Sequence, residues 1–152
     1  MSRGETVSTS DDIIQEIAIK APAERIFEAL TNPRQRIAWW GAPGRFQTTH
    51  MESDLRPGGL WLMSGTGMGH PFTVRGAYRR IERPRLLEFT WLPDWQPDAT
   101  ESLVRFDLEE RAGITTVRLT HSGLTASARQ AHRGWPQILG WLQTYAEART
   151  PS

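Results

Sequence analysis

The chain has 152 residues, with 18 lysine and arginine residues, 17 aspartate and glutamate residues, and no cysteine. This length suits one domain with its own core, and the lack of cysteine excludes disulfide and thiolate chemistry. A net charge of +1 gives no electrostatic reason to expect a nucleic acid or an anionic membrane surface as partner.

The seven tryptophans are the unusual part of the composition. So many indoles indicate large contact surfaces or a lined pocket, although filling a core would also use them. The first residues, MSRGETVSTSDD, contain no apolar run typical of a signal peptide, and no stretch is long enough to span a membrane. We therefore expect a cytoplasmic protein without membrane insertion.

The N-terminal part predicts a strand followed by two helices. Residues 1–11 are small and polar and are expected to form a disordered tail. Residues 13–20, IIQEIAIK, are rich in β-branched side chains and predict a strand. The next stretch is helical up to Asn32, which can cap a second helix that starts at Pro33. A break is expected at 41–44.

From Arg45 onward the pattern changes to short strands joined by turns. Apolar and polar residues alternate, so one side of each strand faces a core. The predicted strands are 45–53, 60–66, 71–81, 86–92, 102–110 and 114–121. Six consecutive strands with short turns predict an antiparallel meander, which the first strand joins at an edge or closes.

The last segment predicts a helix that is interrupted near Gly134. Thr125 can cap residues 126–133, and Gly134 with Pro136 then forces a kink or a new start. Apolar side chains follow a helical period at Trp135, Ile138, Leu139, Leu142 and Ala146. Because a long antiparallel sheet curls, this helix is expected to cover the concave face.

Several short motifs between residues 13 and 147 are typical of one superfamily. They are Ala21-Pro22-Ala23-Glu24-Arg25-Ile26-Phe27, Thr31-Asn32-Pro33, Trp39-Trp40, Asp54-Leu55-Arg56-Pro57-Gly58-Gly59, Gly76-Ala77-Tyr78, Pro84-Arg85-Leu86-Leu87-Glu88-Phe89-Thr90-Trp91, Leu119-Thr120-His121-Ser122-Gly123-Leu124 and Gly134-Trp135 with Leu139 and Leu142. The pattern resembles the START-like (SRPBCC) superfamily, in the branch of activator of Hsp90 ATPase homologues.

The resemblance implies a single α+β domain over 12–149 with the helix-grip fold, in the order β-α-α-β6-α. In that fold a curved antiparallel sheet wraps around a long C-terminal helix and leaves a cavity between them. Members of the superfamily include lipid and hormone carriers, polyketide cyclases, antibiotic self-resistance proteins and co-chaperone domains. The resemblance therefore implies an architecture and not one reaction.

One set of large apolar side chains is expected to line the cavity. It comprises Trp40, Trp61, Met63, Phe89, Trp91, Trp135, Leu139 and Leu142. The members on the last helix would roof the cavity, those on strands would form its floor, and Trp40 with the 65–71 tip would guard an entrance. Apolar walls with a few polar groups suit a hydrophobic small molecule, such as a planar polyketide, a sterol-like body or a fatty chain. The same side chains could instead form a solid core.

His121 is the candidate polar group, because it has inward parity on its strand. It could bind a ligand carbonyl or act as a general acid or base, or a backbone carbonyl at the strand end could simply satisfy it. His50, His70 and His132 lack the spacing of a metal site, so neither a metal nor a cofactor is expected.

The remaining polar residues have structural interpretations. Asp54 and Arg56 flank a Pro-Gly-Gly turn and are expected to form a salt bridge, while Glu52 could enter the cavity as a base. Glu109 and Glu110 adjoin a hairpin turn and are expected to be solvated. A triad of Ser64, His121 and Asp107 can be written, but the sequence does not fix its geometry, and GTGMG at 65–69 lacks the following helix of a phosphate loop.

Three functions follow as hypotheses. The first is non-catalytic binding of an apolar, aromatic or lipid-like molecule. The second is a cyclase or aromatase that holds a polyketone folded while His121 moves protons. The third, implied by the name of the family, is a module that associates with an Hsp90-type ATPase. A homodimer through an exposed apolar edge also stays open.

Overall fold

A computed structural model gives the fold and describes residues 12–42, 46–67, 69–94, 101–125 and 134–148. The helices are α2 (Ala23–Thr31), α3 (Pro33–Trp39) and α5 (Trp135–Ala148). The strands are β1 (Ile13–Ile19), β2 (Gly41–Ala42), β3 (Phe46–Ser53), β4 (Leu60–Gly67), β5 (His70–Glu82), β6 (Leu86–Pro93), β7 (Ser102–Arg111) and β8 (Ile114–Ser122).

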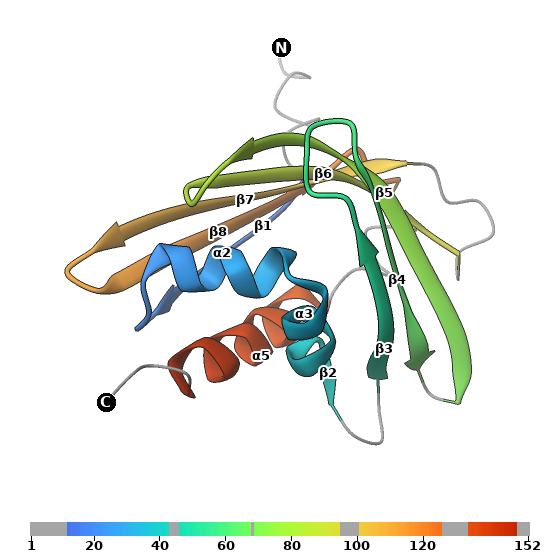
Figure 1. The fold of residues 1–152 in the computed structure, drawn as a ribbon, viewed down its shortest axis with the longest axis horizontal. Helices are drawn as coiled ribbons and strands as arrows, with labels where there is room; N and C mark the ends of the chain where they lie inside the picture. The colour runs from blue at the N-terminus through green and yellow to red at the C-terminus, as the bar shows by residue number, and fades with distance from the viewer. Residues whose placement is uncertain (1–11, 43–45, 68, 95–100, 126–133, 149–152) are drawn as a thin grey trace, which may run out of the picture.

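The strands form one eight-stranded sheet in the order β1-β8-β7-β6-β5-β4-β3-β2. Figure 1 shows that this sheet curves and that α2, α3 and α5 all lie on its concave side. Neighbouring strands are antiparallel throughout, and β1 adds to the edge at β8. The α+β helix-grip fold and the meander of six strands are therefore confirmed.

The expected break at 41–44 begins instead with a short strand. Gly41 and Ala42 form β2, which pairs with Gln47 and Phe46 of β3. Gly41 has a φ of 140°, a conformation that glycine adopts far more easily than other residues. The chain can therefore leave α3 and turn at once onto the edge of the sheet.

The helix starts depend on different kinds of cap. The Asn32 side chain accepts hydrogen bonds from the backbone N–H groups of Arg34 and Gln35, which confirms it as the N-cap of α3. α2 has no side-chain cap of its own, and Glu110 supplies one from β7 by accepting from the Ala23 N–H at 2.8 Å. Glu109 and Glu110 are exposed, as expected, and Glu110 also caps α2 because the fold brings the β7–β8 hairpin to this helix end.

The last helix begins where the sequence predicted a new start. α5 runs from Trp135, directly after Gly134, and its buried side chains are Trp135, Leu139, Leu142 and Ala146. The predicted helix at 126–133 lies outside the described residues, as does the predicted tail at 1–11, so the cap at Thr125 stays a prediction. The buried face of α5 has the predicted period and points toward the sheet.

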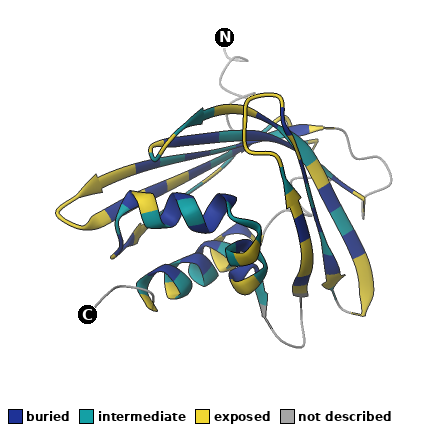
Figure 2. Ribbon diagram, in the orientation of Figure 1, coloured by how far each residue is buried: buried dark blue, intermediate teal, exposed yellow. Residues whose placement is uncertain are grey.

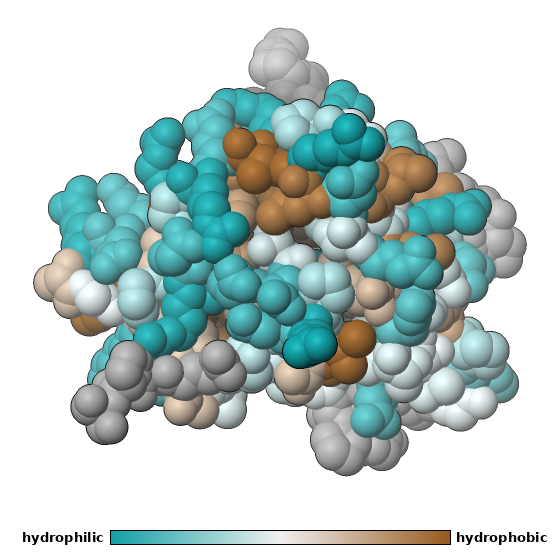
Figure 3. All heavy atoms as spheres, viewed as in Figure 1, coloured by the Kyte–Doolittle hydropathy of each residue, from teal (hydrophilic) through white to brown (hydrophobic). Residues whose placement is uncertain are grey.

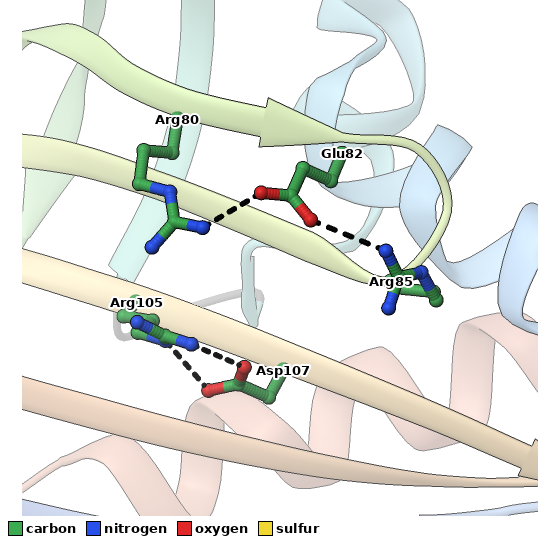
Figure 4. Close-up of polar contacts among 5 residues, drawn as sticks. All are labelled: Arg80, Glu82, Arg85, Arg105 and Asp107. Carbon is green, nitrogen blue, oxygen red and sulfur yellow. Dashed lines mark hydrogen bonds and ion pairs between the residues drawn. The ribbon is translucent and has the colours of Figure 1, made fainter.

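The two faces of the sheet differ in character. Figure 2 shows buried and exposed residues alternating along the strands. On the outer face Glu82 accepts from Arg80 at 2.7 Å and from Arg85 at 3.2 Å (Figure 4). Arg105 binds Asp107 through two nitrogens, and these hydrogen bonds raise the pKa of Arg105. The outer face therefore pairs its charges in solvent, and the concave face holds the core.

Gly76 makes the aromatic packing on the concave face possible. It lies opposite Trp61 on the neighbouring strand β4. A Cβ atom at position 76 would lie 1.9 Å from the Thr90 carbonyl oxygen and 2.8 Å from Trp61 Nε1. Without that atom, the rings of Trp61 and Trp91 approach across β5 to a centroid distance of 5.9 Å.

Gly76→Ala should destabilise the protein by about 2–4 kcal/mol, because the added methyl group meets backbone that cannot move away. Gly140→Ala on α5 is the matched control, since a Cβ there meets no atom within 4 Å and alanine favours a helix by about 1 kcal/mol. Urea unfolding compares the two variants. Equal stability of both would contradict this account of Gly76.

Candidate functional site

The structure brings the predicted cavity residues together in one buried cluster. Trp40, Trp61, Met63, Phe89, Trp91, His121, Trp135, Leu139 and Leu142 are each no more than 3% exposed. They come from the end of α3, from β4, β6 and β8, and from α5. Strand parity and helix period thus selected side chains that are far apart in sequence and near one another in space.

Five of these side chains form what we call the aromatic cluster: Trp40, Trp61, Phe89, Trp91 and Trp135. Their neighbouring ring centroids lie 5.2–6.2 Å apart, in tilted or edge-on arrangements. Rings at such distances contact one another, so the cluster is also part of the core. Trp40 is 1% exposed and lies inside this core, although the sequence placed it at an entrance.

His121 links the sheet to α5 through both of its ring nitrogens. Its Nδ1 atom lies 3.1 Å from Trp135 Nε1, and its Nε2 atom lies 2.8 Å from Ser102 Oγ. Because an indole nitrogen only donates, Nδ1 must accept, and the proton of the neutral ring sits on Nε2. Ser102 Oγ then accepts from His121 and donates to the Trp91 carbonyl at 3.3 Å.

This arrangement suits a structural role for His121, which fixes the position of Trp135, better than a role in proton transfer. Both nitrogens of His121 are engaged, and the side chain is fully buried. Of the two alternatives for His121, the structure favours a histidine satisfied within the protein, and the side chains of Ser102 and Trp135 are its partners. Sequence reasoning missed Ser102, although its position at the start of β7, on the parity of the buried Val104, could have indicated it.

The other polar candidates lie away from the cluster. Glu52 is exposed and pairs with His50 at 2.8 Å, so it does not enter the interior as a base. Asp107 pairs with Arg105 on the outer face and cannot complete a triad with His121. The salt bridge at the Pro-Gly-Gly turn is confirmed, with Arg56 Nε 2.7 Å from Asp54 Oδ2.

A buried arginine is the main feature of this interior that sequence reasoning missed. Arg36 of α3 is 2% exposed, and its guanidinium carbon lies 4.3 Å from the centre of the Trp40 ring. Nη1 donates to the Leu30 carbonyl at 2.8 Å, but Nε and Nη2 have no hydrogen-bond partner among the described residues. Arg36 precedes Trp39 and Trp40 by three and four positions, and this helical spacing could have indicated it.

Burial controls the protonation of Arg36 and of its neighbour Tyr78. Burial lowers the pKa of Arg36 to about 10, although the nearby Tyr78 acts in the opposite direction. Burial also raises the pKa of Tyr78, whose hydroxyl lies 2.6 Å from Ser53 Oγ. At neutral pH the interior therefore holds a cation next to a neutral phenol.

Open hollows on the surface are lined by residues of the described part of the chain. One, of about 400 Å³, is lined by Pro22, Glu24, Arg25, Glu28 and Gln35. Another, of about 520 Å³, is lined by Glu52, Leu60, Trp61, Leu62, Arg75, Gly76, Ala77, Leu92 and Glu101. Neither hollow is lined by His121 or α5. Figure 3 shows apolar surface beside the loop between β3 and β4, where Leu55 is exposed.

The described part of the chain holds neither a cluster of metal ligands nor a membrane-spanning helix. Among those residues, no three or more histidine, aspartate and glutamate side chains gather where they could hold a metal ion. The described helices include none with the length and apolar character needed to cross a membrane.

Residues 20–147 match the sequence profile of the family described as activator of Hsp90 ATPase homolog 1-like protein. The chain belongs to this family. The match begins directly after β1 and spans α2, α3, the strands from β2 to β8 and α5 almost to its end. The resemblance seen in the sequence is therefore confirmed. A comparison with curated proteins gave no match.

Solved structures show how widely this family fold is shared. Protein CV1439 from Chromobacterium violaceum superposes with a TM-score of 0.81 at 21% identity, covering 94% of this chain and 99% of that one. Protein Ms6760 from Mycobacterium smegmatis gives 0.80 at 23% identity, with 95% and 94% covered. CalU16 from Micromonospora echinospora gives 0.64 at 25% identity, with 89% and 75% covered.

Arg36→Met should raise the free energy of unfolding at pH 7 by about 1–2 kcal/mol, because it removes a buried, incompletely paired charge and keeps an apolar side chain. The lowered pKa of Arg36 fixes the sign: the cost is present in full below about pH 10 and is relieved as the pH rises from there toward the ordinary pKa of arginine. Arg34→Met on the exposed side of α3 is the control, with an expected change within about 0.5 kcal/mol. Marked destabilisation by Arg36→Met in urea unfolding would contradict this interpretation.

Proposed function

We propose that this domain binds an apolar small molecule, aromatic or lipid-like, between α5 and the concave face of the sheet. Membership of the family and the fold support a ligand-binding domain. The observation that carries the finer proposal is the convergence of the aromatic cluster from four separate elements onto one place. Met63, Leu139 and Leu142 extend its apolar surface on the strand and helix sides.

Binding requires a guest to replace some of the contacts between rings. An aromatic pair contributes about 0.5–1.5 kcal/mol beyond the burial of its area. When a guest slides between two rings, the protein loses one contact between rings, and the guest forms two new ones. The free-energy cost of separating the rings is therefore offset by the new contacts. The tilted and edge-on contacts of Trp40 and Trp91 with Trp135 suit this exchange. In the proposal His121 orients the guest indirectly, by holding Trp135.

The two other hypotheses have less support. A cyclase or aromatase that uses His121 for proton transfer would first have to break its bond to Ser102 or to Trp135. Association with an Hsp90-type ATPase is supported by the printed description of the family alone. Binding without catalysis is therefore the function that the geometry favours.

Titration with the polyketide emodin, the steroid testosterone and palmitate tests the proposal through intrinsic tryptophan fluorescence. At least one probe should quench the emission of the wild-type protein in a saturable way. Trp135→Phe should weaken that binding by roughly tenfold, because it removes ring area and the bond to His121. Trp141→Phe, the same substitution on the half-buried side of α5, should change it less than about twofold.

The free energy of unfolding of each variant is measured in parallel, which shows that a loss of binding is not caused by unfolding. A folded wild-type protein that gives no saturable signal with any of the three probes would count against the proposed function. Equal effects of the two tryptophan substitutions would place the binding site elsewhere.

A further inference from the structure

The guanidinium of Arg36 is only partly used by the protein. Its Nη1 atom donates to the Leu30 carbonyl, and its central carbon lies over the Trp40 ring at 4.3 Å from the ring centre. The two nitrogens without a partner, Nε and Nη2, form the edge of the group from which two N–H bonds point in parallel. This edge is the one that binds both oxygens of a carboxylate at once.

A cation in this position calls for an anion. Arginine side chains are rarely fully buried unless a partner compensates the charge. The ion pairs formed among the described residues use other arginines, such as Arg83, Arg105 and Arg118, and none includes Arg36. Burial without compensation is also what lowers the pKa of Arg36. The interior thus carries an uncompensated positive charge.

The uncompensated edge lies beside the proposed binding surface. Arg36 contacts the Trp40 ring at 4.3 Å and is 5.8 Å from the centre of the Trp61 ring. Trp40 in turn contacts Trp91 and Trp135. The indole nitrogen of Trp61 is a second buried donor without a partner among the described residues. If the acidic group of a ligand binds Arg36, the rest of the ligand therefore lies against the aromatic cluster.

We propose that the ligand is an apolar acid whose carboxylate binds the Nε and Nη2 edge of Arg36 while its hydrophobic body lies on the aromatic cluster. This inference rests on the proposed function and narrows it to one chemical class. The proposal predicts a preference for charge in addition to shape and apolarity. An ester or an alcohol with the same hydrophobic body would leave the cation of Arg36 without an anionic partner.

Matched pairs of probes test the proposal. Each pair has one body and differs only in the charge: 2-naphthoic acid with methyl 2-naphthoate, and cis-parinaric acid with methyl cis-parinarate. Binding to the intact protein is followed by tryptophan fluorescence at neutral pH. In at least one pair, the wild-type protein should bind the acid roughly tenfold or more tightly than the ester, as expected for a two-donor bond to a buried arginine.

Two variants test whether Arg36 causes the preference for the acid over the ester. Arg36→Met should bind acid and ester with equal affinity, at about the level of the ester on the wild-type protein. Arg34→Met, on the exposed face of the same helix, should keep the preference for the acid. If Arg36→Met does not fold, the comparison of acid and ester on the wild-type protein still tests the proposed anion site.

The outcomes separate the two proposals. Binding of acid and ester with equal affinity by the wild-type protein would overturn the anion site and leave the apolar pocket in place. A preference for the acid that survives Arg36→Met would also overturn it. Failure of all four probes to bind a folded protein would remove the proposed function together with the anion site.

Discussion

The interior of this protein depends on one indole ring at the start of α5. Trp135 contacts the rings of Trp40 and Trp91, and its N–H donates to His121. These contacts join the terminal helix to α3 and to two strands of the sheet. Because the indole can only donate, the same bond fixes the tautomer of His121 and, through it, the orientation of the Ser102 hydroxyl. The helix position and the polar interior are thus set together.

Charge is distributed unevenly between the two sides of the sheet. On the outer face opposite charges on one or two strands pair in solvent, as Arg105 does with Asp107 and Arg118 with Glu16. On the concave side Arg36 is buried against Trp40 with one hydrogen bond to a backbone carbonyl. A chain with a net charge of +1 had ample acidic residues to compensate this cation. Arg36 is nevertheless buried without an acidic partner among the described residues, and for this reason we assign its pairing to a ligand.

The sequence predicted those parts of the structure that follow from periodicity. Alternation along the strands and the spacing along α5 identified the concave set, including Trp61, Trp91 and Trp135, because each depends on local geometry alone. The cap from Glu110 to Ala23 spans 87 positions and could not be seen locally. Arg36 was missed because a charged residue in a polar stretch is normally solvated, and it is buried by tertiary packing that includes Trp61 of β4. The partners of His121 likewise follow from the register between strands.

The most direct test of this account is a crystal structure of the protein with 2-naphthoate. The account predicts that both carboxylate oxygens lie about 2.7–2.9 Å from Nε and Nη2 of Arg36. The naphthyl ring should lie against Trp40 and Trp61, with the contacts between indoles opened to admit it. Crystals in which a protein group or an ordered water occupies that edge, with the rings in unchanged contact and no naphthoate between them, would contradict the account.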